Sequence, residues 1–470
     1  MKVNPGTKVI ILAALAVFAC NFSGCAGNGT RTDTVKVAYW EKWTGFEGDA
    51  MQAVVDLFNS RNIKNKAGKV IQVEMITTSQ LDRRLLTAAA GGNPPDVAGV
   101  WTWLVTVYAD KGALLCIDDY LRDAGITEER YVPVFWEICK YKDKMWGLPS
   151  TPASVALHWN KRLFREAGLD PNAPPKTIRE LDEMAEKLTL IQLPHQEKPI
   201  SFYELKTKKN YEELLAAGKI IQMGFLPSEP GWWPWFWGYW FGGRLWDEKE
   251  TVTCDDPGNI DAYNWVSAYS SKYGVDNVNK FSSSFGVFAS PQNAFLSSKV
   301  AMEIQGVWMY NFIDKYATGM DWAAAPFPSD EGKWKDVSYI EADILVIPKG
   351  AKHPDEAFKF ISFVNTQEAM ELLCEGQRKF TPLKEVSEGF YARSKNPYIR
   401  MFRRLAESPN GFITPKIIIW QEYQREIGFA TDMIRNLKAT PKAALTEARK
   451  AMQLRLDREL EVARRAEKEK

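Results

Sequence analysis

Alternating strand and helix patterns between residues 35 and 112 constrain the fold of this chain most strongly. Residues 35–40 (VKVAYW) alternate in side-chain character, which is typical of a half-buried strand. The two patterns then repeat along the chain: a helix at 51–58, a strand at 69–76, a helix at 81–90, a strand at 94–100 and a helix at 103–111. Regular alternation of this kind predicts an α/β fold.

The pattern changes at residues 144–160 (KMWGLPSTPASVALHWN), whose second half alternates as a strand does. Pro149 and Pro152 bracket this change, and we expect a boundary between two lobes near residue 151. Farther along we expect a charged, irregular insertion at 190–222, a strand within 337–350, one long helix over 354–374 and a mainly helical last 100 residues.

The N-terminus has the features of an export signal. Two lysines precede residues 9–19 (VIILAALAVFA), a run of 11 apolar residues. A membrane-spanning helix needs about 20 such residues, so the run fits the core of a signal peptide over 1–24. Cys25 follows Ser-Gly and resembles the lipidated cysteine of a bacterial lipoprotein, with Cys20 as the alternative, and 25–33 would then be a tether. A plain secretory signal with two incidental cysteines remains open.

The remaining cysteines are Cys116, Cys139, Cys254 and Cys374, and they show no metal-binding spacing. Export permits a disulfide, and only Cys116 and Cys139 are close in sequence. Both a bridge between these two and buried free thiols are compatible with the sequence. The formal net charge of +1 gives no electrostatic signal for nucleic-acid binding.

No catalytic constellation is recognisable in the sequence. The three histidines, His158, His195 and His353, are scattered, and the motifs HExxH, GxSxG and GxxxxGK[ST] are missing. Neighbouring acids such as Asp118 and Asp119 are more typical of surface pairs and helix caps than of a glycosidase site. We therefore expect no catalytic residue, no metal and no cofactor.

Tryptophan recurs where predicted strands end. Residues 40–43 (WEKW) follow the first strand, and residues 101–103 (WTW) follow the third. Ligands of open α/β sheets lie beyond the carboxyl ends of the strands, so these loops predict an aromatic-walled cleft. An indole offers a flat apolar face that matches a sugar ring. The alternative for each tryptophan is a place in the core.

Residues 229–246 (EPGWWPWFWGYWFGGRLW) contain six of the 18 tryptophans. The stretch is too short to span a membrane and is interrupted by proline and glycine. Core and binding surface therefore remain as its possible roles.

Several stretches, taken in order, resemble one known family. They are TVKVAYWEKWTGFEGDAMQAVVDLFN, LLTAAAGGNPPDVAGV, YADKGALLCIDDYL, MWGLPSTPASVALHWNKRLFREAGLDPNAPPKTIRELDEMAEKLT, WFGGRLWDE, VAMEIQGVWMY and ILVIPKGAKHPDEAFKFISFVNTQEAM. The chain is similar over nearly its whole mature length to the bacterial extracellular solute-binding proteins of carbohydrate-importing ABC transporters, a group that includes maltodextrin-binding proteins.

The resemblance implies two α/β lobes joined by a multi-crossing hinge, with the ligand between them. It places the crossings near 149–153, 326–328 and 372–380. Lobe 1 would comprise residues 34–150 and 328–372, and lobe 2 residues 151–327 and 373–470.

The resemblance also implies site residues, matched position by position. They are Trp40, Glu41, Trp43, Gln80, Trp101, Trp103, Trp232, Trp233 and Trp308. Glu341, where many relatives have a glycine-rich segment, either points into the cleft or lies at its rim, and Arg378 is a comparable candidate. We expect the rest of the tryptophan-rich stretch to form a helix that begins at Pro234, buries Trp237, Tyr239, Trp240 and Phe241, and ends at Gly242-Gly243, with Trp235 unassigned.

The function implied is that of an exported, lipid-anchored monomer that captures a carbohydrate, specifically an oligosaccharide, and delivers it to the permease subunits of an ABC importer at the cell envelope. Such a protein is not an enzyme and needs no cofactor. An exported carbohydrate-active enzyme is the first alternative. A binding protein for a polyamine, a peptide or ferric ion is the second, although tryptophan-rich loops with few acids favour a sugar.

Overall fold

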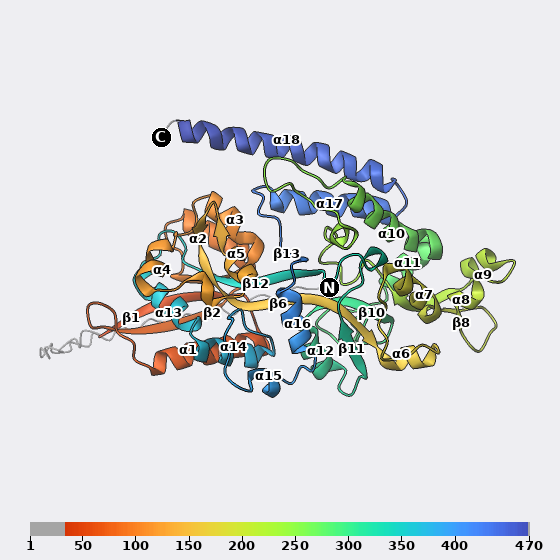
Figure 1. Ribbon diagram of the computed structural model, residues 1–470, viewed down its shortest axis with the longest axis horizontal. Coiled ribbons are helices and arrows are strands. Elements are labelled where there is room, and N and C mark those ends of the chain that lie inside the picture. Colours follow the sequence, from red (N-terminus) through yellow and green to blue (C-terminus); the bar gives the residue numbers. More distant parts are fainter. Residues whose placement is uncertain (1–32, 469–470) are drawn as a thin grey trace, which may run out of the picture.

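The computed structural model describes residues 33–468. Figure 1 shows two α/β halves side by side, with helices α17 and α18 lying together along one edge. The expected signal peptide, Cys20, Cys25 and nearly all of the tether lie outside the described residues. Within residues 33–468, no helix combines the length and the apolar character that crossing a membrane requires.

The first half contains the alternating elements predicted from residues 35–112. Its early elements are β1 (Thr34–Glu41), α1 (Gly45–Ser60), β2 (Val70–Thr77), α2 (Leu81–Ala90), β3 (Val97–Trp101), α3 (Thr102–Asp110), α4 (Asp118–Ala124), α5 (Pro133–Ile138) and the hairpin β4 (Lys140–Tyr141) and β5 (Lys144–Met145). β1 pairs in parallel with β2 on one side and with β3 on the other. The α/β alternation predicted from the sequence is therefore confirmed.

Two long strands connect the halves. β6 (Gly147–Asn160) is buried over its whole length and pairs antiparallel with β12 (Ser338–Val346). They stand at the centre of the main sheet, whose order is β2-β1-β3-β12-β6-β10-β9-β7-β8. The strand expected across residue 151 is thus one continuous element that belongs to both halves (Figure 1).

The second half extends the same sheet. Its elements are α6 (Lys161–Glu166), α7 (Ile178–Leu188), β7 (Leu190–Gln192), β8 (Ile200–Ser201), α8 (Phe202–Leu205), α9 (Tyr211–Ala217), β9 (Lys219–Phe225), α10 (Pro257–Tyr273), α11 (Val275–Ser282), β10 (Val300–Gly306), α12 (Met309–Tyr316) and β11 (Trp322–Ala325). The segment 190–222 was expected to be irregular, but β7 and the first residues of β9 lie in it and pair with each other in the sheet. Their short apolar runs, separated by charged loops, conceal the strand pattern.

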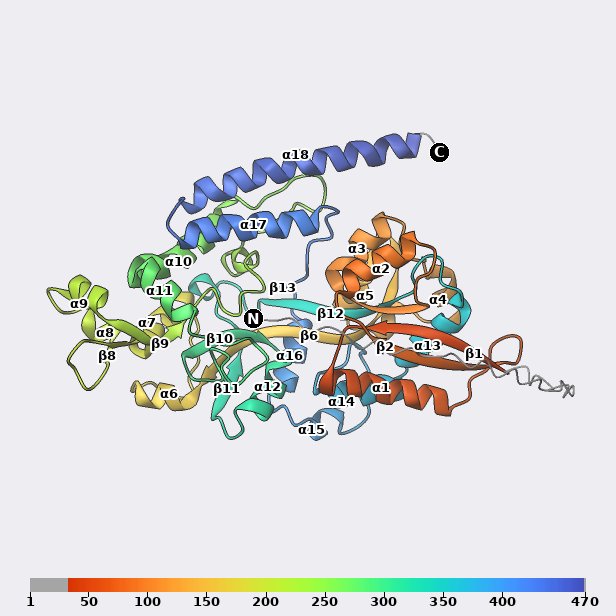
Figure 2. The same ribbon diagram turned by 180° about the vertical axis from the view of Figure 1, so that it is seen from behind.

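The C-terminal part is mainly helical, as predicted. It contains α13 (Pro354–Val364), α14 (Gln367–Gln377), α15 (Phe390–Arg393), α16 (Ile399–Ala406), the short strand β13 (Gly411–Phe412), α17 (Trp420–Arg435) and α18 (Pro441–Lys468). Figure 2 shows α18 lying along α17 and projecting past it at its C-terminal end.

The single helix expected over 354–374 is two helices. α13 ends at Val364, and the Thr366 side chain caps the start of α14 by accepting a hydrogen bond from the backbone N–H of Ala369 at 3.4 Å. Asn365, between the two helices, accepts a hydrogen bond from the Tyr131 hydroxyl at 3.0 Å. A partner distant in sequence therefore stabilises a break that local periodicity does not reveal.

The prediction of a helix that begins at Pro234 is also wrong, both in where the helix begins and in its type. Pro234 lies in a turn, and only a 3-10 helix, η2 (Trp237–Phe241), follows it. The expected burial of Trp237, Tyr239 and Trp240 is confirmed, but Phe241 is only half-buried. Gly242 ends the segment with a positive φ of 79°. Trp235, unassigned from the sequence, is in the core.

Two large hydrophobic clusters and a small one, made of Phe295, Leu296, Met309 and Ile313, form the core of the described part of the chain. The first draws mostly on residues 37–153 and 340–406, and the second mostly on 155–304 and 412–456. Tyr339 packs in the second cluster and Ile340 in the first, so β12 itself makes a crossing, later in the chain than 326–328. The chain next passes between the clusters after Ala406, rather than at 372–380, so residues 373–406 pack with the first half.

Candidate ligand-binding cleft

A cavity of about 470 Å³ lies between the two halves, a volume typical of small-molecule sites. Its wall is largely aromatic and comes from both halves. The lining residues are Trp43, Glu47, Trp101, Trp103, Thr151, Ala153, Trp232, Trp233, Phe288, Trp308, Phe312, Glu341, Ala342, Asp343 and Lys379. Six tryptophans that are far apart in sequence therefore face a single space.

The first half contributes three indoles from the ends of its strands. Trp43 follows β1, and Trp101 is the last residue of β3. The rings of Trp101 and Trp103 lie nearly parallel, at 8° with centroids 6.2 Å apart. Their position agrees with the rule that parallel strands present ligand sites at their carboxyl ends.

The second half contributes an interlocked group of rings. Trp232 packs edge-on against Phe288 at 4.5 Å between centroids and lies 6.2 Å from Trp308. Trp233 lies 6.1 Å from Trp308. Trp232 remains 43% exposed, whereas Trp233 is only 9% exposed. Trp232 is therefore the ring of this wall with the most surface free for a ligand.

The backbone at the end of β10 fixes the position of Trp308. A Cβ atom at Gly306 would stand 2.4 Å from the Trp308 ring, so the indole lies directly on the glycine. The Trp308 indole N–H donates to Gln305 Oε1 at 3.1 Å, and the same oxygen accepts the backbone N–H of Gly306. The Gly-x-Trp spacing thus provides room for the ring, and Gln305 sets its orientation.

Asp343 is the centre of a buried polar network on the cavity floor. Its carboxylate accepts hydrogen bonds from the Trp43 indole N–H at 2.8 Å and the Thr151 hydroxyl at 2.6 Å. Its other oxygen lies 2.8 Å from Lys42 Nζ. Burial alone would raise the pKa of Asp343, but Lys42 and Lys379 lower it below its usual range, so the group is ionised at neutral pH.

A second ion pair lies beside this network. Lys379 Nζ is 3.0 Å from Glu47 Oε1 and 5.5 Å from the centre of the Trp43 ring. Each buried cation of the floor thus has a carboxylate partner, and the paired charges leave little net charge to attract an ionic ligand.

Glu341 is a carboxyl group of the cavity whose pKa is raised into the neutral range. Burial, followed by the negative charge of Asp343, raises its pKa to about 7, although Lys42 and Lys379 oppose the shift. Around neutral pH this carboxyl is therefore able both to donate and to accept hydrogen bonds.

Seven of the eleven residues predicted for the site line the cavity: Trp43, Trp101, Trp103, Trp232, Trp233, Trp308 and Glu341. Of the two positions considered for Glu341, the structure therefore has the one in the cleft. The other four predicted residues, Trp40, Glu41, Gln80 and Arg378, lie outside the wall.

Glu41 lies beneath the wall, 1% exposed. Its carboxylate accepts from the Tyr39 hydroxyl and from the Lys42 backbone N–H, and it packs so closely on Gly99 that a Cβ there would clash. It therefore helps to position the loop that holds Lys42 and Trp43. Of the three residues predicted in this loop, Trp43 lines the cavity, and Trp40 and Glu41 do not.

Trp40, Gln80 and Arg378 also lie outside the cavity wall, each in a different environment. Trp40 packs, partly buried, against the first core cluster, and Gln80 is exposed at the start of α2 in a left-handed conformation with φ of 53°. Arg378 ends α14 and pairs with Asp314 at 2.6 Å.

Eight lining residues were not predicted from the sequence: Glu47, Thr151, Ala153, Phe288, Phe312, Ala342, Asp343 and Lys379. Thr151 and Ala153 fall inside the predicted crossing at 149–153, and Asp343 is two residues from Glu341, so both segments had been singled out. Phe288 and Phe312 gave no signal, because a lone phenylalanine is more typical of a core.

Within residues 33–468, no group of three or more His, Cys, Asp or Glu side chains is arranged to hold a metal ion. In the same part of the chain, the four cysteines at 116, 139, 254 and 374 are free thiols. The structure thus has free thiols where the sequence left a Cys116–Cys139 bridge open.

Two α/β halves that share long central strands and enclose an aromatic cavity define the class of two-lobed, hinged binding proteins. Residues 53–396 match the model of one family, described as bacterial extracellular solute-binding protein. The chain belongs to this family. The family membership and the two-lobed α/β fold expected from the sequence are confirmed. Because the family is extracellular, the protein is an exported one.

Comparison with known proteins identifies sugar-binding relatives. A maltotriose-binding protein of Pyrococcus abyssi is 24% identical over 61% of this chain, and the match spans only 54% of that protein. The structure of CpMnBP1 with mannotriose bound has a TM-score of 0.73 at 29% identity and covers 88% of this chain and 99% of its own. The sugar-binding protein MalE of Xanthomonas citri, at 18% identity, shares the fold with a TM-score of 0.68.

Proposed function

We propose that this protein captures a neutral oligosaccharide in the aromatic cleft and delivers it to an ABC importer. The single observation that supports this most is the convergence of six indoles from both halves on a cavity of about 470 Å³. Sugar rings have apolar C–H faces and hydroxyl edges. Stacked indoles provide the matching apolar surfaces, and the Asp343–Thr151–Glu341 region provides polar groups for the edges.

The charges of the cavity also favour a neutral ligand. The lysines of the floor are paired with carboxylates, as Lys42 is with Asp343 and Lys379 with Glu47. A polyamine site would need several free carboxylates, and an anion site would need a free cation. The paired network leaves hydrogen bonding and stacking as the main sources of affinity.

The relatives support the size of the ligand. CpMnBP1 is described with mannotriose and also with mannobiose bound, and the P. abyssi relative is named for maltotriose. We therefore propose a short oligosaccharide of two or three units as the ligand. Lipid anchoring through Cys25, with Cys20 as the alternative, a monomeric state and docking to permease subunits complete the proposal.

A thermal-shift screen tests the ligand class. Ligand that binds only the native state raises the unfolding midpoint, so mannobiose, mannotriose or maltotriose should raise it in proportion to the logarithm of its concentration. Glutamate and spermidine serve as charged comparison solutes. Midpoints that shift with spermidine or glutamate and with none of the sugars would contradict the proposal.

We further propose that the protein performs no hydrolysis. A glycosidase needs two carboxyl groups free to act on the scissile bond, whereas Asp343 is held by Lys42, Thr151 and Trp43. Mannotriose and maltotriose should be recovered intact after prolonged incubation with the pure protein. Release of shorter sugars, detected by anion-exchange chromatography, would establish the enzymatic alternative instead.

A further inference from the structure

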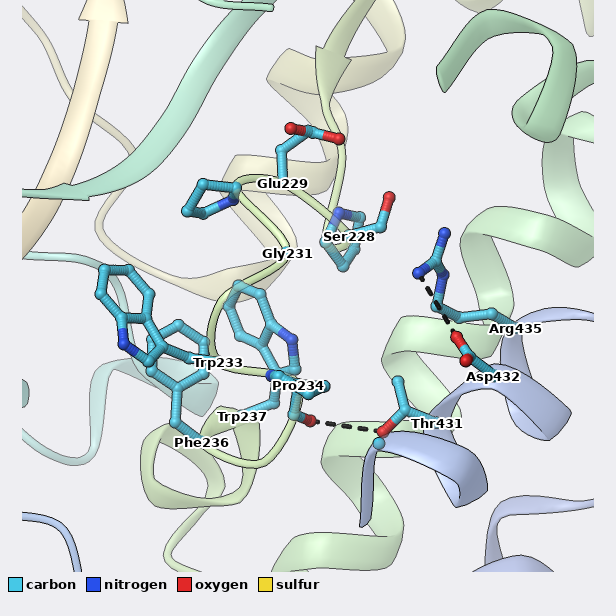
Figure 3. A pocket seen from close by; sticks show the side chains of 13 residues that line it. Ser228, Glu229, Gly231, Trp233, Pro234, Phe236, Trp237, Thr431, Asp432 and Arg435 are labelled. Carbon is cyan, nitrogen blue, oxygen red and sulfur yellow. Dashed lines mark hydrogen bonds and ion pairs between the residues drawn. The ribbon is translucent and has the colours of Figure 1, made fainter. Parts of the chain in front are cut away.

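A second cavity, of about 170 Å³, shares Trp233 with the cleft. It lies between the loop 227–237 and helix α17, and its lining includes Ser228, Glu229, Trp237 and Arg435 (Figure 3). No part of the proposed transport function uses this cavity. It is a separate space, since none of its other lining residues is shared with the cleft.

Thr431 is satisfied by the carbonyls of Ile427 and Pro234, but other polar groups of this cavity lack close partners in the part of the chain that the structure describes. Arg435 has one ion pair there, with Asp432 at 4.0 Å, and Asp432 is itself mostly exposed. The hydroxyl oxygen of Ser228 is buried and has no hydrogen-bond partner within residues 33–468. Buried polar groups are nearly always hydrogen-bonded. Polar side chains that line a cavity without such partners are therefore available to a ligand.

Glu229 and Arg435 approach the cavity from different elements, the loop and α17 (Figure 3). Within residues 33–468, Glu229 and Arg435 do not form an ion pair with each other. Burial raises the pKa of Glu229 to about 7, and Arg435 only partly opposes that shift. A carboxyl and a guanidinium thus stand at one hollow without neutralising each other.

The combination of groups indicates the chemistry of a ligand. Adjacent hydroxyls of a sugar ring donate to a carboxylate and accept from a guanidinium at the same time. The indole of Trp237 and the rings of Pro230 and Pro234 provide apolar surface around the hollow. At about 170 Å³ the cavity is much smaller than the cleft of about 470 Å³, so its size suits one sugar ring and not a chain.

We propose that this cavity is an accessory site for a single monosaccharide, separate from the oligosaccharide site in the cleft. Arg435 and Glu229 bind its hydroxyls, Ser228 adds a third polar contact, and Pro234, which is only partly buried, packs against the ring. The proposal does not rest on the transport function, because none of these four residues lines the cleft.

Gly428 allows a blocking variant that leaves the charged residues in place. It lies on α17 and lines the small cavity, and a Cβ there would have its nearest neighbour, Pro234 Cγ, at 3.9 Å. Gly428→Leu should therefore be accepted by the helix, for which leucine is a better former than glycine, while its side chain fills the hollow. Arg435→Gln removes the guanidinium and is the second variant.

The experiment is a titration with D-mannose followed by saturation-transfer NMR, with glycine as a zwitterionic comparison. The expected result is saturable D-mannose binding that persists when mannotriose is in excess and in Trp232→Ala, a cleft variant. The affinity should fall at least tenfold in both Gly428→Leu and Arg435→Gln, with each variant shown to be folded by circular dichroism.

Three results would overturn the proposal: no D-mannose binding, D-mannose binding that mannotriose abolishes, or binding that both variants leave unchanged. Binding of glycine in place of D-mannose would show that the ligand class is wrong. If mannotriose does not bind at all, the proposed transport ligand fails, and the comparison of wild type with Gly428→Leu still decides this site.

Discussion

Trp232 and Trp233 are neighbours in the chain, yet they differ in how they belong to the cleft wall. Trp232 is 43% exposed, whereas Trp233 is 9% exposed and packs against Phe236, Trp308 and Tyr339. A ligand gains most from the exposed ring, and the fold gains most from the buried one. Substitutions at these two positions therefore separate binding from stability.

Trp232→Ala should weaken oligosaccharide binding by about 1–3 kcal/mol, because it removes an apolar surface that is not part of the core. Its free energy of unfolding should change by less than about 1 kcal/mol. Trp233→Ala should also lose binding but destabilise the fold by about 3–5 kcal/mol. Calorimetric titration and urea unfolding measure the two quantities, and equal stability losses in both variants would contradict this division.

Glu341 should make the free energy of unfolding depend on pH. Its pKa is raised from 4.5 to about 7 in the folded state, so the folded protein binds this proton more tightly than the unfolded chain does. The resulting stabilisation is fully present below pH 4.5 and is lost as pH rises through about 7.

Glu341→Gln tests this dependence, because glutamine has a similar shape and does not ionise. The stability of the wild type relative to Glu341→Gln should fall between pH 5 and pH 8. Glu229 and Glu303 also have raised pKa values, but they are present in both proteins and cancel in the difference. A difference that is constant with pH, or that grows as pH rises, would show that the carboxyl is not protonated as described.

Single residues of the site were predictable where a local rule applied. Tryptophans at strand ends were found because strand periodicity fixes where each strand stops. Asp343 and Lys379 were missed because their importance arises from partners 192 and more positions away in the chain, such as Thr151 for Asp343. Contacts of this kind depend on the assembled fold and leave no local pattern.

At the scale of the element, the end of β10 shows how backbone shape controls a binding ring. Gly306→Ala should displace the Trp308 indole, because the new Cβ would stand 2.4 Å from it. We expect binding to weaken about as much as in Trp308→Ala, although residue 306 does not line the cavity. Titration calorimetry of both variants measures the two losses.

A double-mutant cycle provides the control for this prediction. If Gly306→Ala acts by moving the indole, it should cost little further affinity in a Trp308→Ala background. Additive losses in the double variant would mean that Gly306→Ala perturbs something other than Trp308.

Elements differed in how well the sequence predicted them. The strands and helices between residues 34 and 110 have regular apolar spacing and were predicted correctly. The break between α13 and α14 was not, because Asn365 is held by Tyr131, a residue from another part of the chain. The tryptophan-rich segment was expected to be an α-helix but contains only a short 3-10 helix. Most of its aromatic rings are buried in the second cluster, so its apolar pattern does not distinguish the two helix types.

At the scale of the whole molecule, the two halves are joined through β6 and β12 and also meet across the cleft. Phe46 of α1 and Phe312 of α12 lie edge to face with centroids 6.2 Å apart. The lobes are therefore close together in this structure. The α/β class was predictable because it depends only on the periodicity of apolar residues. The crossings between the halves at β12 and after Ala406 were not, because they depend on which of the two hydrophobic clusters each residue packs into.

Hinge closure should be visible in solution. Small-angle scattering should give a larger radius of gyration without sugar than the value calculated from this structure, and addition of mannotriose should reduce it. Identical scattering curves with and without a sugar that is shown to bind would exclude closure as the mechanism of capture.

The central claim is that an oligosaccharide binds between the lobes against the six indoles, and a crystal structure of the complex with mannotriose tests it most directly. We predict sugar rings stacked on Trp232 and on the Trp101–Trp103 pair, with hydroxyls in hydrogen-bond contact with Glu341 or Thr151. Sugar density found elsewhere on the molecule, with the indoles of the cleft in contact with solvent alone, would contradict the account.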